Sequence, residues 1–424
     1  MKLTESRAAR VLRWVKVDWL GVDDPRARRG RRHSHAGVLT LVMGAFATGV
    51  ASMRAVEELC ERLTRRSLRA LGLKGNVSDT AAYELVKRQN PAGMAQVLLR
   101  QVKDALASKT LTNDLFESGV LAIDGKQVWV GKHEAHPECQ LRHWDDGTPY
   151  WQLFAQRASL VSSSARPCVS QQFIPGKTNE VASFAAFFAF LLQHFGRSFE
   201  VVTSDSGGTS RHNAAVVNAG QKAYVFAVKE NQPTIYAAAR SRLGCKEMPG
   251  DAKLAGEVRT DDRAQGRDVT REIFRTTVEP GDPEVDFAGA RQLWRVRQTT
   301  TERDDDGKAL NRSVEDRYFI VNAVFSATRA LTLVRLHWGI ENGANWTMDM
   351  VLHEDDGSPC AQGEGAIVVS WLRLLAYNVA AMFRTRLPRK HGENTSWKKA
   401  LNLLEDALRG LPWAAAELPA PVLE

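Results

Sequence analysis

The chain contains 424 residues, which is more than one compact core usually holds and suits two or three domains. Hydrophobic residues make up 44% of the chain, which excludes an intrinsically disordered protein. The 57 Lys and Arg residues outnumber the 49 Asp and Glu residues and give a formal net charge of +8. A basic balance favours a polyanionic partner, although many proteins without such a partner share it.

The first 115 residues predict a helical domain. Apolar residues recur at helical spacing from His35 to Leu63, Ser78 is placed as an N-cap, and Pro91 opens a further helix. A dense basic segment precedes these helices and is either a DNA-backbone contact or a solvated entry loop. Its arginines are Arg26, Arg28, Arg29, Arg31 and Arg32. We interpret residues 1–115 as an N-terminal DNA-binding domain.

A strand-rich core is predicted to begin near Val120. Apolar runs predict strands at 126–130, 151–160, 167–173, 199–203 and 223–228, and helices at 180–195 and 211–219. Three strands, helix, strand, helix, strand is the order of a ribonuclease-H-like α/β core. We place this core at 116–244 and 312–390. The β-like runs of 245–311 predict a β-rich insertion, and helices are expected at 328–342, at 366–386 as an amphipathic helix, and in the tail at 391–424.

Three acidic residues stand where a metal site could form. Asp124 and Asp205 each end an apolar run, and Glu341 lies on the predicted helix 328–342. Each residue also has an ordinary explanation. Asp124-Gly125 is a hairpin-turn signal, Asp205 could cap the next helix, and Glu341 could pair with an arginine at the surface. Two strand-end carboxylates and one on a helix nevertheless suit two divalent cations, which prefer hard oxygen ligands.

The motifs around these residues resemble the DDE transposases of bacterial insertion sequences, in the H-repeat-associated (ISAs-type) branch. They begin with Asp24-Pro25-Arg26 and continue through the two strand ends to the segment around Glu341. In chain order the later motifs are Ala122-Ile123-Asp124-Gly125-Lys126, Lys177-Thr178-Asn179-Glu180, Val202-Thr203-Ser204-Asp205, Ala227-Val228-Lys229-Glu230-Asn231-Gln232, Glu315-Asp316-Arg317-Tyr318, Arg335-Leu336-His337-Trp338-Gly339-Ile340-Glu341-Asn342, Trp346-Thr347-Met348-Asp349 and His353-Glu354-Asp355. One departure matters, because related families carry a lysine where this chain has Met348.

The resemblance implies a catalytic set of Asp124, Asp205 and Glu341 that holds two Mg²⁺ or Mn²⁺ ions. It implies cleavage at the ends of an insertion sequence and joining of the freed 3′-OH to target DNA. The expected partner is double-stranded DNA, both terminal inverted repeats and target, with a homodimer in the complex. The five cysteines predict no disulfide framework, and the sequence predicts no signal peptide, membrane span or nucleotide site. We therefore expect a cytoplasmic bacterial protein that joins the nucleoid when bound.

Further side chains are candidates for DNA contact, each with a plain structural alternative. Lys126, Lys229, Arg335, His337 and Asn342 could hold scissile-site phosphates, or lie at the surface or orient Glu341. Asp349 is a possible auxiliary acid, and an acidic loop at Glu354 to Asp356 is at least as plausible as a ligand set. His133, His136, Cys139 and His143 have zinc-like spacing, but they come just after the first core strand and have no counterpart in the family pattern, so a polar hairpin loop is favoured over a metal site. Trp294 could stack on a flipped base at the transposon end, but a role as a core residue of a β-strand is favoured.

Two other functions remain open at this point. One is a nuclease on the same fold that does not transfer strands. The other is a domesticated DNA-binding protein without catalysis, which the retention of all three acidic residues disfavours. Inverted repeats beside the gene would favour a transposase over a nuclease.

Overall fold

The computed structural model describes residues 17–176, 179–251, 255–264, 266–304, 306, 308–388 and 394–411. The chain divides into two compact units, which we treat separately. Unit 1 comprises Met1–Leu115, Gly125–Asn179 and Ile340–Glu424, and unit 2 comprises Phe116–Asp124 and Glu180–Gly339. Lys177 and Thr178 of the predicted motif, and parts of the predicted tail at 391–393 and 412–424, lie outside the described residues.

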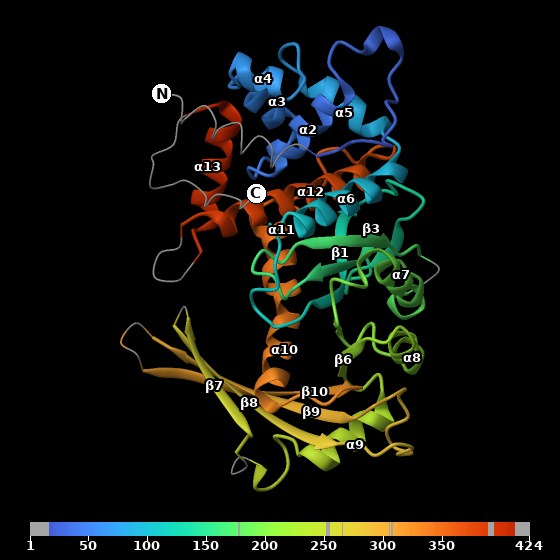
Figure 1. Cartoon of the computed structure of the whole chain (residues 1–424), viewed down its shortest axis with the longest axis vertical. Helices are drawn as coiled ribbons and strands as arrows, with labels where there is room; N and C mark the ends of the chain where they lie inside the picture. Colours follow the sequence, from blue (N-terminus) through green and yellow to red (C-terminus); the bar gives the residue numbers. More distant parts are fainter. Residues whose placement is uncertain are drawn as a thin grey trace. The chain divides into compact units, whose positions relative to one another are not determined.

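The N-terminal part of unit 1 is helical, as predicted (blue in Figure 1). Its elements are η1 (Arg28–Gly30), α2 (His35–Phe46), α3 (Met53–Glu61), α4 (Arg65–Ala70), α5 (Asp79–Arg88), η2 (Pro91–Gly93) and α6 (Met94–Ala107). Hydroxyl groups of Ser34, Ser52, Thr64 and Ser78 cap α2 to α5. The apolar pattern from His35 to Leu63 is split into two helices because Gly49 takes a left-handed φ of 84° between them.

The helix α12 (Gly365–Arg386) is the central helix of unit 1. It packs against α2, α5, α6, β4 and α13 (Trp397–Arg409). The sequence predicted an amphipathic helix here, and this was wrong, because nearly every residue through Phe383 is buried. Among the described helices, α12 alone is long and apolar enough to cross a membrane, and its apolar window is entirely buried inside the protein.

Unit 1 also holds an antiparallel group of strands. It contains the second half of β1 (Val120–Gly131), β2 (Gln140–His143), β3 (Pro149–Leu160) and β4 (Cys168–Phe173). One edge of β3 pairs with β2 near Trp151 and with β4 near Gln172, and β1 is its other neighbour in the sheet. After Gly339 the chain enters unit 1 again through a π-helical turn (Ile340–Asn345, η4) and the short helix α11 (Trp346–Met350).

Unit 2 begins with parallel strands. The first half of β1 pairs in parallel with β5 (Val201–Ser204), which pairs in parallel with β6 (Ala223–Val228). The connecting helices are α7 (Glu180–Phe195) and α8 (Arg211–Ala219), and they pack against each other. Phe184, Phe187 and Phe188 of α7 are buried, which explains why this segment folds as a helix with one aromatic face toward the core.

An antiparallel meander completes unit 2. It comprises β7 (Val258–Ala264), β8 (Arg267–Thr277), β9 (Gln292–Arg303) and β10 (Ala309–Val321). The predicted insertion is therefore β-rich. Its strands extend the sheet of β6, because β10 pairs antiparallel with β6 from Tyr318 to Val321. The sheet of unit 2 runs in the order β1-β5-β6-β10-β9-β8-β7, with α9 (Pro233–Leu243) packing on β8, β9 and β10 and with α10 (Ala327–Gly339) packing on β5, β7 and β8.

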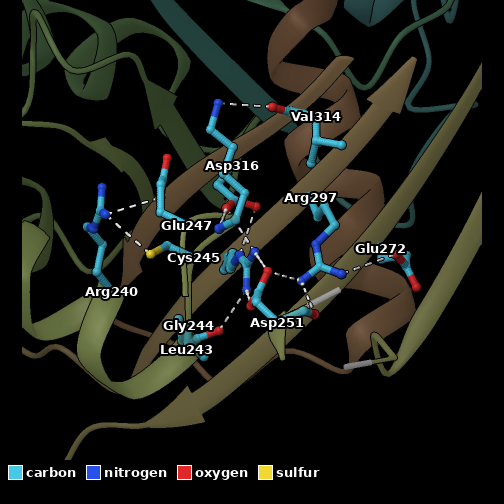
Figure 2. Close-up of polar contacts among 12 residues, drawn as sticks. Arg240, Leu243, Gly244, Cys245, Glu247, Asp251, Glu272, Arg297, Val314 and Asp316 are labelled. Atoms are coloured by element: carbon cyan, nitrogen blue, oxygen red, sulfur yellow. Dashed lines mark hydrogen bonds and ion pairs between the residues drawn. The ribbon is translucent and has the colours of Figure 1, made fainter. Parts of the chain in front are cut away.

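The face of the meander next to α9 encloses a buried arginine network (Figure 2). It consists of Arg295, Arg297, Asp251 and Asp316, of which Figure 2 labels the last three. Arg295 is fully buried and donates to both carboxylates, at 2.6–2.8 Å, while Arg297 reaches Asp251 at 2.5 Å. Hydrogen bonds from Arg295 hold the pKa of Asp251 below its usual range. Arg297 also lies 3.9 Å from Glu272, so each arginine of this network has two carboxylate partners.

Candidate active site

Asp124 and Asp205 stand at the same edge of the sheet of unit 2. Ile123 of β1 is in register with Ser204 of β5, and the two strands are parallel. The next residue of each segment is an aspartate. Asp124 lies within β1, directly after its last residue paired with β5, and Asp205 follows the end of β5, so both carboxylates come just after the paired segment. The turn predicted as an alternative for Asp124-Gly125 does not occur, because β1 continues through both residues to Gly131.

The loop after β5 is built around the Asp205 carboxylate. Its Oδ1 accepts hydrogen bonds from the backbone N–H groups of Gly207 and Gly208, at 3.1 and 3.2 Å. The alternative role of Asp205 as a cap of α8 is not realised, because Ser210 caps that helix and accepts from Asn213 at 3.0 Å. Asp205 is half-buried, so its position is defined by the backbone around it.

Glu180, the first residue of α7, lies beside Asp205. A Cβ atom at Gly207 would approach Glu180 Oε2 to 2.6 Å and both Asp205 carboxylate oxygens to 3.3 Å. Both carboxylates therefore border one small space that only glycine leaves open. Burial and the negative charge of Asp205 raise the pKa of Glu180 to about 7. The sequence motif contained Glu180, but nothing in the sequence alone brought it to Asp205.

Glu341 lies in unit 1, on the π-helical turn that follows α10. The predicted helix 328–342 is thus observed as α10, which ends at Gly339, and a wider turn. Single π-turns within helices are rare and often occur at functional sites. Glu341 and Asn342 are exposed on this turn. A side chain at Gly343 would meet the Arg166 guanidinium at 2.7 Å, so this arginine packs on the backbone of the turn.

His337 does not lie where the sequence placed it as a phosphate contact. It is buried, and its Nδ1 shares a hydrogen bond of 2.9 Å with the hydroxyl of Thr203 on β5. Burial lowers the pKa of His337 to about 4, so the ring is neutral at physiological pH. His337 therefore holds α10 against the strand that leads to Asp205. The alternative predicted from the sequence was that it orients Glu341.

Lys126 forms an ion pair with the candidate auxiliary acid Asp349 within unit 1. The Lys126 Nζ atom lies 2.5 Å from Asp349 Oδ2 and 3.5 Å from Asp355 Oδ1. Burial raises the pKa of Asp349 to about 6, although the hydrogen bond from Lys126 opposes this shift. Lys126 follows Asp124 by two residues in the chain, and its ammonium is already engaged by these two carboxylates.

Glu354 differs from the prediction of a solvated acidic loop. Its carboxylate is buried and accepts two hydrogen bonds of 2.7 Å from Arg157 of β3, which is also fully buried. Burial alone would raise the pKa of Glu354, but the charge of Arg157 holds it below its usual range. Arg373 of α12 donates to the backbone carbonyls of His353 and Gly357 and so secures the same loop. Asp355 and Asp356 remain exposed.

The basic N-terminal segment separates into two kinds of arginine. Arg26 and Arg31 both pair with Asp24, at 2.9 and 3.2 Å, and so stabilise the loop itself. Arg28, Arg29 and Arg32 are exposed. Lys229 at the end of β6 is also exposed. Arg335 is 42% exposed and pairs with Asp262 at 3.1 Å.

Within the described ranges, no group of three or more His, Cys, Asp and Glu side chains is arranged to hold a metal ion. His133, His136, Cys139 and His143 therefore do not form the zinc site that their spacing resembles, and His136 contacts Glu364 at 3.1 Å. All five cysteines are unpaired and buried. Trp294 is fully buried and donates to Gln292, as expected for a core residue.

Comparison with known proteins adds relatives across most of the chain, although no family model matches it. "Putative protein YbfL" of Escherichia coli (strain K12) is 24% identical over 368 residues, covering 84% of this chain and 88% of that protein. "H repeat-associated putative transposase YhhI" of the same organism is 24% identical over 322 residues, covering 74% and 76%. The piggyBac transposase synaptic complex with hairpin DNA aligns with 96% of this chain and 78% of its own, at 12% identity and a TM-score of 0.44. The YhhI match confirms the family resemblance seen in the motifs.

Proposed function

We propose that this chain, which is related to the H repeat-associated transposases, is itself a DNA transposase of the DDE type. The observation that carries the proposal is the register of β1 with β5, which leads to Asp124 and Asp205 directly after the last paired residues of the two strands. Apart from the short additional strand β2, the order β1, β2, β3, β4, α7, β5, α8, β6 also agrees with a ribonuclease-H-like core. The reaction is cleavage at the ends of an insertion sequence, followed by joining of the 3′-OH to target DNA.

The donor chemistry of this edge fits a hard divalent cation. Asp124 and Asp205 offer carboxylate oxygens, and Gly207 leaves the space beside Asp205 free of a side chain. Asp124, Asp205 and Glu341 are the residues proposed to hold Mg²⁺ or Mn²⁺. When bound, two such ions lower the pKa of the attacking hydroxyl group and neutralise charge on the leaving oxygen.

The chain's own residues position these ligands. Backbone N–H groups of Gly207 and Gly208 orient the Asp205 carboxylate, so only one of its oxygens is committed to them. His337 joins α10 to Thr203, two residues before Asp205. Glu180 adds a carboxyl group with a pKa of about 7 next to Asp205, so an added positive charge there would favour its ionised form.

The test is metal-dependent cleavage of linear DNA that carries the sequence flanking the gene. The wild-type protein with Mn²⁺ should cut at defined positions and join the cut end to a second duplex. Asp124→Asn and Asp205→Asn should each lower the cleavage rate by at least about a thousandfold, since each removes a charged ligand of the metal. Asp356→Asn, an exposed acid in the loop after α11, is the matched control and should cleave normally.

The same experiment separates the other candidate functions. Cleavage without joining would indicate a nuclease on this fold. DNA binding without cleavage in the wild-type protein would indicate a domesticated binding protein. Normal cleavage by Asp205→Asn would refute the assignment of the site. Two element ends must be brought together, so a homodimer is the expected state on DNA, and sedimentation of the complex measures it.

A further inference from the structure

The face of the meander next to α10 carries a surface arginine cluster, which we define as Arg271, Arg317 and Arg335 with Trp338. Arg271 lies opposite Gln298 on β9, and Arg317 lies opposite Val296. Residues 296 and 298 alternate with Arg295 and Arg297, so the cluster and the buried arginine network occupy opposite faces of one sheet. Arg335 and Trp338 come from α10, which packs on this face.

The indole ring of Trp338 contacts two of the arginines, Arg317 and Arg271. The Arg317 guanidinium carbon lies 4.7 Å from the centre of its ring, and that of Arg271 lies 5.3 Å away. Stacking on an indole orients a guanidinium while leaving its N–H donors available at the edges. Arg317 is 41% exposed and Arg335 is 42% exposed. Trp338 itself is half-buried, so it anchors the cluster to the sheet.

Among the described residues, two carboxylates pair with the three arginines of this cluster. Asp262 is shared between Arg271, at 2.6 Å, and Arg335, at 3.1 Å. Arg317 pairs with its near neighbour Glu315 at 3.2 Å, and Glu315 is itself 56% exposed. Burial and the charges of Arg335 and Arg317 lower the pKa of Arg271, although Asp262 opposes them. Three guanidinium groups thus stand against two carboxylates, of which Asp262 is shared by Arg271 and Arg335.

We propose that the surface arginine cluster binds the phosphodiester backbone of duplex DNA. This inference rests on the proposed function and names a contact surface for it. Planar guanidinium groups match phosphate oxygens in pairs, and an added polyanion would relieve the mutual repulsion of the three cations. Trp338 precedes Glu341 by three residues, so this surface stands next along the chain to a proposed metal ligand. No base edge is required, so the contact is independent of sequence.

The experiment measures binding of the full chain to fluorescent duplexes across a range of salt concentrations, without metal. One duplex has a random sequence and the other carries DNA that flanks the gene. Arg335→Gln and Arg317→Gln should each weaken binding to both duplexes by about tenfold, which corresponds to about 1.4 kcal/mol. The double variant should reduce the slope of log affinity against log salt by about two, because each lost phosphate contact releases one counterion fewer.

Two controls make the result decisive. Arg259→Gln removes the same charge from β7, where Arg259 pairs with Asp261 and is 59% exposed, and it should change affinity less than twofold. Asp262→Asn removes the shared carboxylate and should strengthen binding to both duplexes. Thermal unfolding of each variant shows whether it is folded.

The outcomes separate this inference from the proposed function. A wild-type protein that binds neither duplex overturns both. A wild-type protein that binds, with Arg335→Gln and Arg317→Gln no weaker than Arg259→Gln, overturns the DNA contact and leaves the proposed function standing. Weaker binding in Asp262→Asn would show that the cluster acts through the fold, and this would also overturn the contact.

Discussion

The two faces of the β7–β10 meander use arginine in opposite ways. On one face, Arg295 is fully buried and both of its charge partners, Asp251 and Asp316, are buried beside it. On the other face, Arg271 and Arg335 share Asp262 and remain partly exposed. A buried guanidinium requires its own carboxylates, whereas a crowded surface guanidinium can leave part of its hydrogen-bonding capacity for a ligand. The comparison therefore distinguishes arginines that stabilise the fold from arginines available for DNA.

The largest effect is expected when the buried arginine network is disrupted. Arg295→Met leaves Asp251 and Asp316 buried without their main partner, and it should lower the free energy of unfolding of unit 2 by about 3–5 kcal/mol. Chemical denaturation measures this loss. The salt dependence of DNA binding by the folded fraction should stay unchanged. A loss below about 1 kcal/mol would show that the network is not a structural pair.

Low pH should also weaken the buried arginine network and so lower the free energy of unfolding. Arg295 lowers the pKa of Asp251, so the folded protein binds that proton more weakly than the unfolded chain does. The stabilisation is complete above the ordinary aspartate pKa of about 3.9, and it should be lost as the pH falls through and below that value. Urea denaturation at a series of pH values measures the loss. Asp251→Asn should show a flatter dependence, and an equal dependence in both proteins would contradict the assignment.

A smaller effect is expected at Trp338, which both packs against the sheet and orients two arginines of the surface arginine cluster. Trp338→Leu keeps apolar bulk but removes the ring that orients Arg271 and Arg317, and it should cost about 1 kcal/mol of stability. DNA affinity should fall severalfold, by less than in the Arg335→Gln and Arg317→Gln double variant. An affinity equal to that of the wild type would separate the indole from the DNA contact.

The smallest effect is expected when Arg335 is replaced by the other basic residue, lysine. Arg335→Lys keeps the charge and loses the planar fork, so the salt slope should persist while affinity falls about twofold. Fluorescence titration at two salt concentrations resolves this difference. A fall as large as that of Arg335→Gln would mean that the geometry of the fork, rather than its charge, dominates binding.

The sequence predicted the local elements of unit 2 well. The helices 180–195 and 211–219 and the strand 223–228 have their predicted bounds, because apolar periodicity and flanking Gly and Asn residues mark them clearly. The Asp124-Gly125 pair was harder to interpret. It is a turn signal, yet Gly125 is not among the glycines with positive φ, and the strand continues through it.

Other features depend on pairing that a single sequence does not contain. Arg157 lies in an apolar strand, which could have signalled a buried partner, but nothing identified Glu354 across 197 residues. The placement of Arg271 and Arg317 on one face follows from the register of three strands. Asp124 and Asp205 belong to unit 2, whereas Glu341 belongs to unit 1. The sequence did not predict that the three candidate acids would be divided between two units.

The burial of α12 has a consequence for synthesis on the ribosome. Its partners α2, α5 and α6 are translated first, but the helix that fills the space among them ends only at Arg386. Until then the early helices pack on one another, but the sides that α12 covers stay exposed. A polypeptide truncated before α12 would expose apolar surface and be a substrate for chaperones and proteases. Only chains that are nearly complete would therefore be able to fold unit 1.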